Sequence, residues 1–297
     1  MGGASTRAAG AALLLAERRA ARHWSAIGEA VLIHLPLIAF IALALFPFVW
    51  AFSTSLKTPS QLLIFPPRYV PSPLAPENYL RAWQKGMGQG FVNSIVVCTV
   101  SVLLTVTIGA LAAYSIGRLR WRGRDLFLVL IIAPLMVPGL VLLVPTYIIM
   151  SQLRLLDTYL VLILLYTVRS LPLSVWIMRG FFETLPHELE EAAHIDGASR
   201  LQVLRHLILP LSQPALVATA LIVFHNSWDD FLVASTMTSR TAMRTVQVAL
   251  YFNIGEYGVD WGALMAAAIM SLAPMLILFL FLQRRFISGI THGALKG

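Results

Sequence analysis

The chain has 297 residues, of which 58% are hydrophobic and only 12% are charged. Soluble globular domains carry about 25% charged residues, so these proportions exclude a protein whose whole surface faces water and indicate a lipid bilayer as the solvent. The net charge of +8 does not indicate nucleic-acid binding, because the basic residues lie in short clusters between long apolar runs, which is the pattern that the positive-inside rule produces.

Six segments are apolar over the roughly 20 residues that a helix needs to cross about 30 Å of hydrocarbon. They are residues 30–52, 91–116, 126–150, 159–178, 211–235 and 262–282. The third contains Pro134, Pro138 and Pro145, and proline kinks a helix because it removes a backbone hydrogen bond. We therefore expect an all-α, polytopic membrane protein with six transmembrane helices.

The basic residues indicate the orientation of these spans. An even number of spans puts both termini on one side, and the segments on that side hold 14 of the 22 Lys and Arg residues, against 7 on the other side and Arg169 within a span. Because positive charge marks cytoplasmic segments, we predict a cytoplasmic N-terminal tail (1–28), a six-helix domain (29–283) and a cytoplasmic C-terminal tail (284–297). Residues 8–16 are apolar but too short to span, so we expect a helix lying on the membrane surface.

The external segment between the first two spans, residues 53–90, contains six prolines. This number predicts an ordered, extended cap and not a long helix. Its glycine-rich stretch, residues 86–90, lacks the Lys-Ser/Thr pair of a phosphate-binding loop. The sequence has no other nucleotide-binding or nucleophile motif, and its seven histidines lack the spacing of a zinc site. We expect no metal, no cofactor bound by this chain and no enzymatic activity.

The cytoplasmic segment 183–210, between the fourth and fifth spans, has strong helix signals. Thr184 is suited to cap a helix and Pro186 to occupy its first turn. Three acidic residues follow where the helix dipole favours negative charge: Glu188, Glu190 and Glu191. These signals predict a short helix that begins just after the fourth span.

A sharp bend and a second helix are predicted next. Gly197 is suited to end the first helix in the left-handed conformation, and Ser199 with Gln202 forms a capping box for the second. Pro210 marks the expected start of the fifth span. By secondary structure alone, this could be an ordinary surface hairpin or a rigid docking element, and both interpretations stay open.

The residue spacing favours a docking element. The segment has, in order, Glu191-Ala192-Ala193, three residues, Gly197, nine residues, Leu207, one residue and Leu209-Pro210. This order resembles the cytoplasmic loop of binding-protein-dependent ABC importer permeases. At the position of Leu207 the family usually has Ile. The resemblance implies the ABC importer permease fold and a coupling segment that docks on an ATPase subunit. The residues implied in this contact are Glu191, Ala192, Ala193, Asp196, Gly197, Leu207, Leu209 and Pro210.

Further motifs resemble the carbohydrate-uptake branch of that family. They lie at residues 93–94, 112–114, 118–123, 155–158, 171–173, 179–182 and 228–231, and the C-terminal stretch resembles the second permease subunit of maltose-type and glycerol-phosphate-type importers. The resemblance implies a multi-pass protein of the bacterial cytoplasmic (inner) membrane that imports a sugar. The implied partners are a second homologous permease, two copies of an ATPase that uses ATP and Mg, an external substrate-binding protein and membrane lipid. A polyol or glycerol-phosphate substrate and, more remotely, a secondary transporter or an intramembrane enzyme are the alternatives.

Four polar residues are candidates for the substrate pathway: Arg169, Asn226, Asp229 and Asp230. Arg169 lies about 18 Å into the fourth span at 1.5 Å per residue, where a cation needs a partner or a wet cavity. The acidic pair is expected about 12 to 15 Å nearer the outer side, so a direct bond between Arg169 and Asp229 is not expected. Arg169 could contact substrate or form a structural ion pair, and Asp229 and Asp230 could line the pathway or a solvated helix end.

Overall fold

The first described helix is an apolar rod. The computed structural model describes residues 32–255 and 258–294, so the predicted N-terminal tail, with its surface-lying helix, lies outside the described residues. The helix Leu32–Ser55 has a mean hydropathy of 2.5 over its most apolar stretch, and its large hydrophobic side chains are exposed. A rod of this length fits the hydrocarbon core, which confirms the span predicted at residues 30–52 from residue 32 onward.

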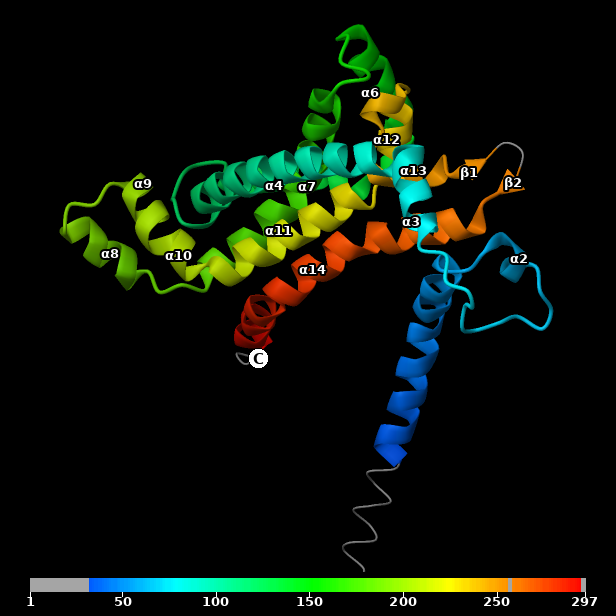
Figure 1. Ribbon diagram of the computed structural model, residues 1–297. Coiled ribbons are helices and arrows are strands. Elements are labelled where there is room, and N and C mark those ends of the chain that lie inside the picture. Colours follow the sequence, from blue (N-terminus) through cyan, green and yellow to red (C-terminus); the bar gives the residue numbers. More distant parts are fainter. Residues whose placement is uncertain (1–31, 256–257, 295–297) are drawn as a thin grey trace, which may run out of the picture. The chain divides into compact units, whose positions relative to one another are not determined.

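The remaining chain forms a helical unit around three long helices. α4 (Gly88–Gly117) lies along α7 (Tyr159–Glu183), and α11 (Gln213–Trp228) packs against both (Figure 1). α14 (Trp261–Ala294) covers α11 and continues through most of the predicted C-terminal tail. Its fully buried Ala263, Ala266 and Ala267 belong to the same core cluster as Trp228 of α11, because small side chains allow membrane helices to approach closely. A two-stranded antiparallel hairpin, β1 (Ile254–Gly255) and β2 (Gly258–Val259), precedes α14.

The number of spans agrees with the prediction. Among the described residues, four helices are long and apolar enough to cross a membrane, and there are up to six if each of two bent helix pairs counts as one span. The model therefore confirms an all-helical membrane architecture, with a small hairpin that the sequence did not predict. The first bent pair covers the third predicted span. The second joins the end of the segment 183–210, at Arg200–Leu211, to the helix Gln213–Trp228 of the fifth predicted span, so neither pair is a straight helix.

The third predicted span, residues 126–150, is two helices and not one. α5 (Arg124–Ile132) and the 3₁₀ turn η2 (Ala133–Met136) meet α6 (Gly139–Gln152) at 99°. Val137, which precedes Pro138, is extended with φ −94° and ψ 123°, because the proline ring disfavours a helical conformation in the residue before it. Pro145 lies inside α6, so one of the three prolines marks the break.

The fifth predicted span, residues 211–235, is also wrong in its bounds. The helix after the coupling segment runs through Pro210 to Leu211, and the chain bends by 80° before α11 begins at Gln213. α11 ends at Trp228, and α12 (Leu232–Met237) follows as a separate short helix. Pro210 lies inside this helical stretch, two residues after the π-helical turn η3 (Leu204–Ile208), so it does not mark the start of the span.

The predicted external cap is extended only in its first part. Between residues 56 and 76 the short helix α2 (Pro59–Leu62) is the one helix, and α3 (Glu77–Ala82) begins directly after the last proline. α3 continues through the π-helical turn η1 (Trp83–Met87) into α4, so the second span starts before residue 91. The glycine-rich stretch is therefore mostly helical, with a kink at Gly86, where φ is +108°.

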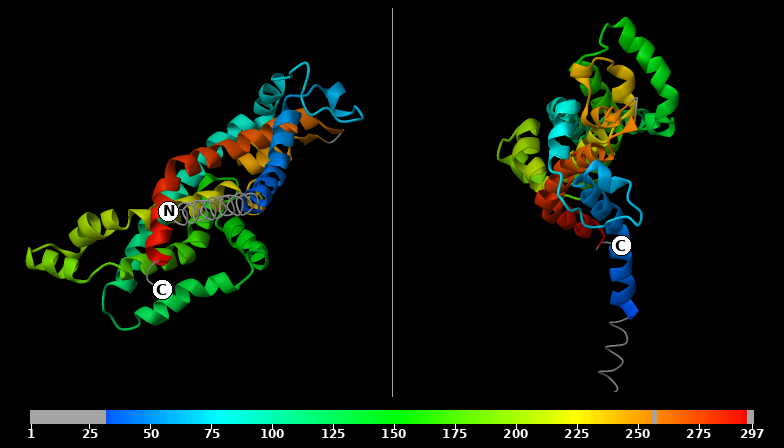
Figure 2. Two further views of the ribbon diagram at one scale, coloured as in Figure 1. Left: turned by 90° about the horizontal axis from the view of Figure 1, so that it is seen from below. Right: turned by 45° about the vertical axis from the view of Figure 1, so that its right-hand side comes forward.

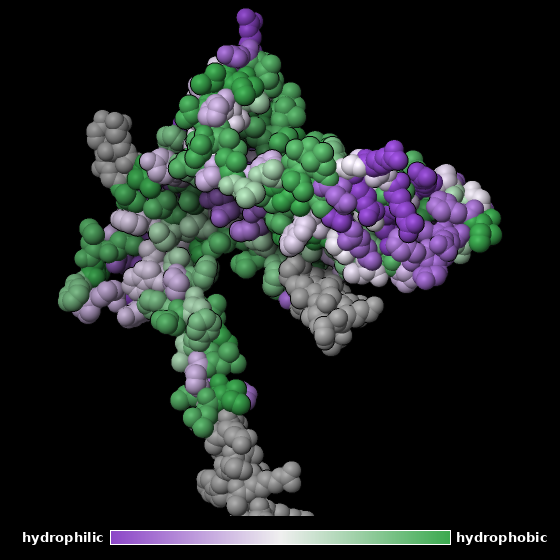
Figure 3. Space-filling view, turned by 180° about the vertical axis from the view of Figure 1, so that it is seen from behind, coloured by the Kyte–Doolittle hydropathy of each residue, from purple (hydrophilic) through white to green (hydrophobic). Residues whose placement is uncertain are grey.

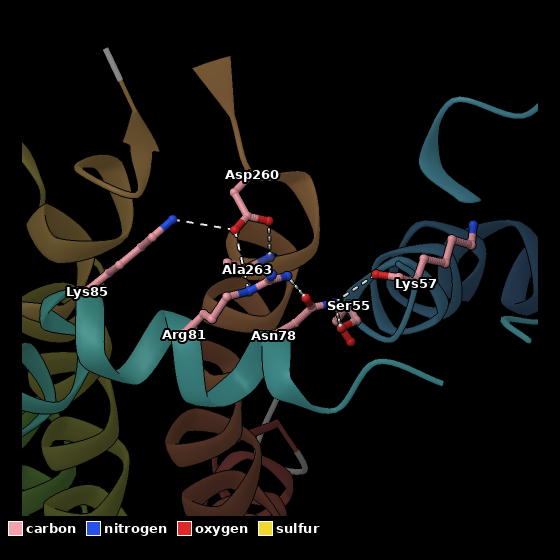
Figure 4. A network of polar contacts seen from close by, with 7 residues as sticks. All are labelled: Ser55, Lys57, Asn78, Arg81, Lys85, Asp260 and Ala263. Carbon is pink, nitrogen blue, oxygen red and sulfur yellow. Dashed lines mark hydrogen bonds and ion pairs between the residues drawn. The ribbon is translucent and has the colours of Figure 1, made fainter. Parts of the chain in front are cut away.

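A polar network joins α3 to the start of α14 (Figure 4). The fully buried Asn78 donates from Nδ2 to the carbonyl oxygens of Ser55 and Lys57 at 2.8 and 2.9 Å. Asp260 caps α14 by accepting from the backbone N–H of Ala263 at 3.1 Å. Partial burial alone would raise the pKa of Asp260, but this bond and the charges of Arg81 and Lys85, at 3.6 and 3.5 Å, hold it below its ordinary value.

A second polar contact fixes the N-terminal end of α7. Asp157 adopts φ +59°, and its Oδ1 accepts from the backbone N–H groups of Ser239 and Arg240 at 2.6 and 2.8 Å. The bond from Arg240 is the main reason that the pKa of Asp157 lies below its usual range. Thr158 then caps α7 by accepting from Val161 N–H at 3.3 Å. The predicted motif at residues 155–158 therefore positions α7 against the loop that follows α12.

Candidate functional site

The coupling segment, residues 183–210, is a helix, a bend and a second helix, as predicted. α8 (Glu188–Ile195) is followed by one helical stretch made of α9 (Arg200–Val203), the π-helical turn η3 (Leu204–Ile208) and α10 (Leu209–Leu211). Figures 1 and 2 show α8 and α9 projecting beyond the ends of α4 and α7. Hydrophilic side chains gather on this projection, whereas the long helices are mainly hydrophobic (Figure 3).

The start of α8 differs from the prediction. Thr184 ends α7, and its hydroxyl donates to Phe181 O at 2.7 Å, so it does not cap α8. His187 occupies the N-cap position, and Pro186 lies outside the helix. A short helix follows α7, as predicted, but it begins later. α7 extends five residues beyond the predicted span and ends at Glu183, with Thr184 as its C-cap. The three acidic residues do lie in the first turn of α8, where the helix dipole stabilises them.

The bend is built as the sequence predicts. Gly197 has φ +83°, and Ala198 N–H donates to Ala193 O at 2.9 Å, which closes the end of α8. Ser199 and Gln202 form the capping box: Ser199 N–H donates to Gln202 Oε1 at 2.8 Å, and Gln202 N–H donates to Ser199 Oγ at 3.4 Å. The direction in which the second helix leaves the bend is therefore fixed by backbone conformation and by two reciprocal bonds.

The residues predicted to contact an ATPase divide into two groups. Five are exposed: Glu191, Ala192, Asp196, Gly197 and Pro210. The other three are half-buried and pack against the core cluster between α4, α7 and η3: Ala193, Leu207 and Leu209. The exposed group is free to meet a partner, whereas the half-buried group positions the segment on the long helices.

Two exposed apolar residues at the bend were missed by the sequence analysis. The exposed fraction of Ile195 is 86% and that of Leu201 is 66%. Both lie on the hydrophilic projection, within six residues of Gly197. Their signal in the sequence was an apolar residue on each side of a predicted bend that is otherwise polar. Together they are candidates for a protein contact, because an exposed apolar patch with a polar rim marks an interaction site, whereas apolar residues exposed singly do not.

A buried ion pair holds α8 against α4. Arg118, directly after α4, has a fully buried side chain and pairs through Nε with Glu190 Oε1 of α8. Its Nη1 donates to Phe182 O and Leu185 O at 3.2 and 2.9 Å, and its Nη2 donates to Pro186 O at 3.3 Å. In the sequence, Arg118 was one of the positive charges that indicate orientation and the first residue of the motif at 118–123, but no pairing with Glu190 was predicted. Its position, four residues after Tyr114 on a helical face, was the available signal.

The candidate pathway residues lie together at the C-terminal end of α11. Arg169, Asn226, Asp229 and Asp230 line one pocket of about 350 Å³, together with His225, Phe231 and Leu232. A second, more apolar pocket of about 380 Å³ between α6 and α7 also includes Arg169. Arg169 therefore lies between the two pockets, which the sequence did not predict.

Arg169 pairs with Asp230 and not with Asp229. Its Nη1 lies 3.5 Å from Asp230 Oδ1, and its side chain is 65% exposed, whereas that of Asp230 is 7% exposed. The other oxygen of Asp230 accepts from Tyr166 Oη and Ala234 N–H, both at 3.0 Å. Asp229 instead accepts from Gln247 Nε2 at 3.0 Å. Asp230 is thus held by three partners, whereas Arg169 is largely exposed and lines the pocket.

The expected vertical separation of 12 to 15 Å between Arg169 and the acidic pair is wrong. It counted helical rise from Pro210 along a straight span, but α11 begins at Gln213 after a bend and ends at Trp228. Because of the bend, helical rise counted from Pro210 overestimates the separation of Arg169 and the acidic pair. The long side chain of Arg169 then reaches Asp230. The expectation that Arg169 and Asp229 do not pair is confirmed, because Arg169 contacts Asp230 and Asp229 accepts from Gln247.

Solved structures share this fold. The chain resembles a permease chain in the crystal structure of a bacterial ABC transporter involved in the import of the acidic polysaccharide alginate, with a TM-score of 0.77 and 23% identity over 86% of this chain and 96% of that one. It also resembles a chain of a bacterial alginate ABC transporter in complex with a pentasaccharide-bound periplasmic protein, with a TM-score of 0.65 and 18% identity over 89% and 98% of the two chains. Both similarities concern the arrangement of helices.

Sequence relatives cover nearly the whole chain. The sulfoquinovosyl glycerol transport system permease protein SmoH of Agrobacterium fabrum is 39% identical over 85% of this chain and 89% of its own length. The trehalose/maltose transport system permease protein MalG of Thermococcus litoralis is 36% identical over 90% and 97% of the two chains. The model of the binding-protein-dependent transport system inner membrane component matches residues 105–292, which include the coupling segment and both pockets. The chain therefore belongs to the family of inner-membrane permease components of binding-protein-dependent ABC transport systems.

Proposed function

We propose that this chain is one of two homologous permease subunits of a bacterial ATP-driven importer, and that the two enclose the pathway of a carbohydrate delivered by an external binding protein. The names of the relatives support a sugar as the substrate: they transport sulfoquinovosyl glycerol and trehalose or maltose. The observation that carries the proposal is the coupling segment, which joins the family spacing from Glu191 to Pro210 with an exposed bend. The charge bias of the sequence supports a cytoplasmic location for this segment and for both termini.

The exposed side of the bend is the proposed contact with one of two ATPase subunits, which would bind ATP and Mg. Ile195 and Leu201 provide the apolar centre of this contact, and Ala192 permits close approach because its side chain is small. Glu191 and Asp196 surround them with charge. Apolar residues with a polar rim are the usual composition of a specific protein interface. ATP hydrolysis would therefore belong to the partner, and this chain would transmit the resulting movement.

The pocket around Arg169 is the proposed place where this subunit lines the pathway. It combines a guanidinium group, the Asn226 amide, the Asp229 carboxylate and the His225 ring with the aromatic residue Phe231. Several donors and acceptors beside an aromatic ring suit a polyhydroxylated ligand. Two carboxylates outnumber one guanidinium group, so the pocket favours an uncharged sugar or polyol over a glycerol phosphate.

The function is tested by transport in proteoliposomes that contain this chain, the second permease and the ATPase. With ATP inside and the binding protein loaded with radiolabelled trehalose or maltose outside, we expect uptake that stops without ATP and persists with a protonophore. Binding protein that has been unfolded by heat is the control. Uptake that needs a proton gradient but no ATP would favour the secondary transporter, and chemical conversion of the sugar by the isolated chain would favour the intramembrane enzyme.

Arg169→Leu should lower uptake at least tenfold while the complex still assembles. Loss of a charged hydrogen-bond donor to the substrate costs about 1.5–3 kcal/mol, and every 1.4 kcal/mol is about a tenfold change. Asp230 keeps its bonds from Tyr166 and Ala234, so the pocket should stay folded. The measurements are uptake and the yield of purified complex, with Arg68→Leu, at an exposed residue of the external cap, as the control. Reduced yield with normal uptake per complex would show a structural ion pair instead.

A further inference from the structure

The strongest unexplained feature is the complete burial of Arg118. Its side chain is 0% exposed, although it lies in a cytoplasmic cluster of basic residues whose neighbours Arg120 and Arg122 are exposed. A buried guanidinium group is costly unless its N–H donors are bonded. Four bonds from its five N–H donors are present. Four buried hydrogen bonds indicate that Arg118 has a role beyond setting the orientation of the protein in the membrane.

The bonds of Arg118 connect two different elements. The three carbonyl acceptors belong to Phe182, Leu185 and Pro186, which span the junction between α7 and α8. The fourth acceptor is the carboxylate of Glu190, inside α8. One side chain at the end of α4 therefore fixes both the junction and the helix beyond it.

α8 has little else to hold it. Glu190 is the one buried residue among the eight of α8, all of which the structure describes, and its Oε2 also accepts from Tyr114 Oη at 3.5 Å. Tyr114 and Arg118 lie one turn apart on α4, so α4 contributes both partners of Glu190. Without them, α8 would be connected to the spans by the short junction 184–187 and by the half-buried Ala193.

We propose that Arg118 is the positioning residue that joins the movement of α8 to α4, so that a displacement at the ATPase contact reaches the transmembrane helices. This inference rests on the proposed function of the coupling segment. α4 packs along the length of α7, and α7 carries Arg169 at the pocket. The route from α8 through Arg118 to α4 and α7 is therefore a continuous set of packed elements, and such a set can carry a movement from one site to another.

The test compares transport per ATP hydrolysed in the complete complex in proteoliposomes. Arg118→Met alone leaves the Glu190 carboxylate buried and unpaired, which destabilises a protein strongly. Replacing both charged partners by apolar residues of similar volume avoids this cost, and leaves only the loss of the donor to the three carbonyl groups. The decisive variant is therefore Arg118→Met with Glu190→Met. We expect normal co-purification of the ATPase, because Ile195 and Leu201 are unchanged, but at least tenfold fewer sugar molecules transported per ATP. Arg120→Met, at an exposed residue of the same cluster, should keep the wild-type ratio.

A second variant keeps the test decisive if the double variant does not assemble. Arg118→Lys retains the charge beside Glu190 but has no fork with which to bond three carbonyl groups, so the ratio should fall at least threefold with normal assembly. A wild-type ratio in either assembled variant would overturn the role of Arg118. Ile195→Asp tests the proposed ATPase contact separately: it should abolish co-purification, and normal co-purification would contradict that contact whatever the Arg118 variants show.

Discussion

Gly197→Val should lower ATP-dependent uptake about tenfold or more, whereas Gly197→Asn should keep most of it. Gly197 has φ +83°, and a β-carbon there would meet no atom within 4 Å. The cost of the substitution is therefore conformational and not steric. The left-handed conformation costs a residue with a β-carbon about 1–2 kcal/mol. The cost is lower for Asn, because its side chain forms local hydrogen bonds.

The functional consequence follows from the position of Gly197. Gly197 forms the bend between α8 and α9. Because valine disfavours a positive φ, Gly197→Val should change the angle of the bend and the direction of the exposed Ile195 and Leu201. About 1.4 kcal/mol corresponds to a tenfold change in an equilibrium, which sets the expected loss of ATPase binding. The measurements are co-purification of the ATPase and uptake in vesicles. Gly180→Val in α7, where a β-carbon also meets no atom and φ is not positive, is the control, and equal uptake by the Val and Asn variants at position 197 would show that the left-handed bend is dispensable.

Gly262→Ala should destabilise the permease by about 3 kcal/mol. A β-carbon at Gly262 would lie 2.6 Å from Nδ2 of the fully buried Asn78, in the network of Figure 4. Asn78 cannot move aside freely, because that nitrogen donates to Ser55 O and Lys57 O. Displacing it leaves buried polar groups unsatisfied, at about 1–3 kcal/mol each. The expected result is a lower temperature of thermal unfolding in detergent, followed by tryptophan fluorescence.

A double-mutant cycle identifies the cause of this loss. In an Asn78→Ala background the obstructing amide is absent, so adding Gly262→Ala should cost little, and the two single effects should not add. Gly180→Ala is the matched control, since alanine favours a helix by up to about 1 kcal/mol over glycine and has open space there. An unchanged melting temperature for Gly262→Ala, or full additivity in the cycle, would mean that the contact with Asn78 carries no stability.

Local features of the sequence were sufficient for much of the fold and for the shape of the coupling segment. Apolar length located the spans, because hydrocarbon thickness sets the length of a membrane helix. Gly197 and the pair Ser199 and Gln202 predicted the bend, because each acts on backbone groups within a few residues of itself. The predicted helix boundaries were wrong where one residue suited the end of one helix and the start of the next. Thr184, for example, ends α7 and does not start α8.

The sequence by itself determined that the protein lies in a membrane, that it has up to six spans, and that a bent helical segment with the spacing of an importer permease lies between two of them. Only the tertiary structure decided which side of that segment is exposed, that Arg118 is buried against Glu190 72 positions away, and that Arg169 reaches Asp230 61 positions away. Contacts over such separations depend on how helices cross and where they break. Pro138 indicated a kink, but the 99° angle at that point depends on packing against neighbouring helices, which no local pattern encodes.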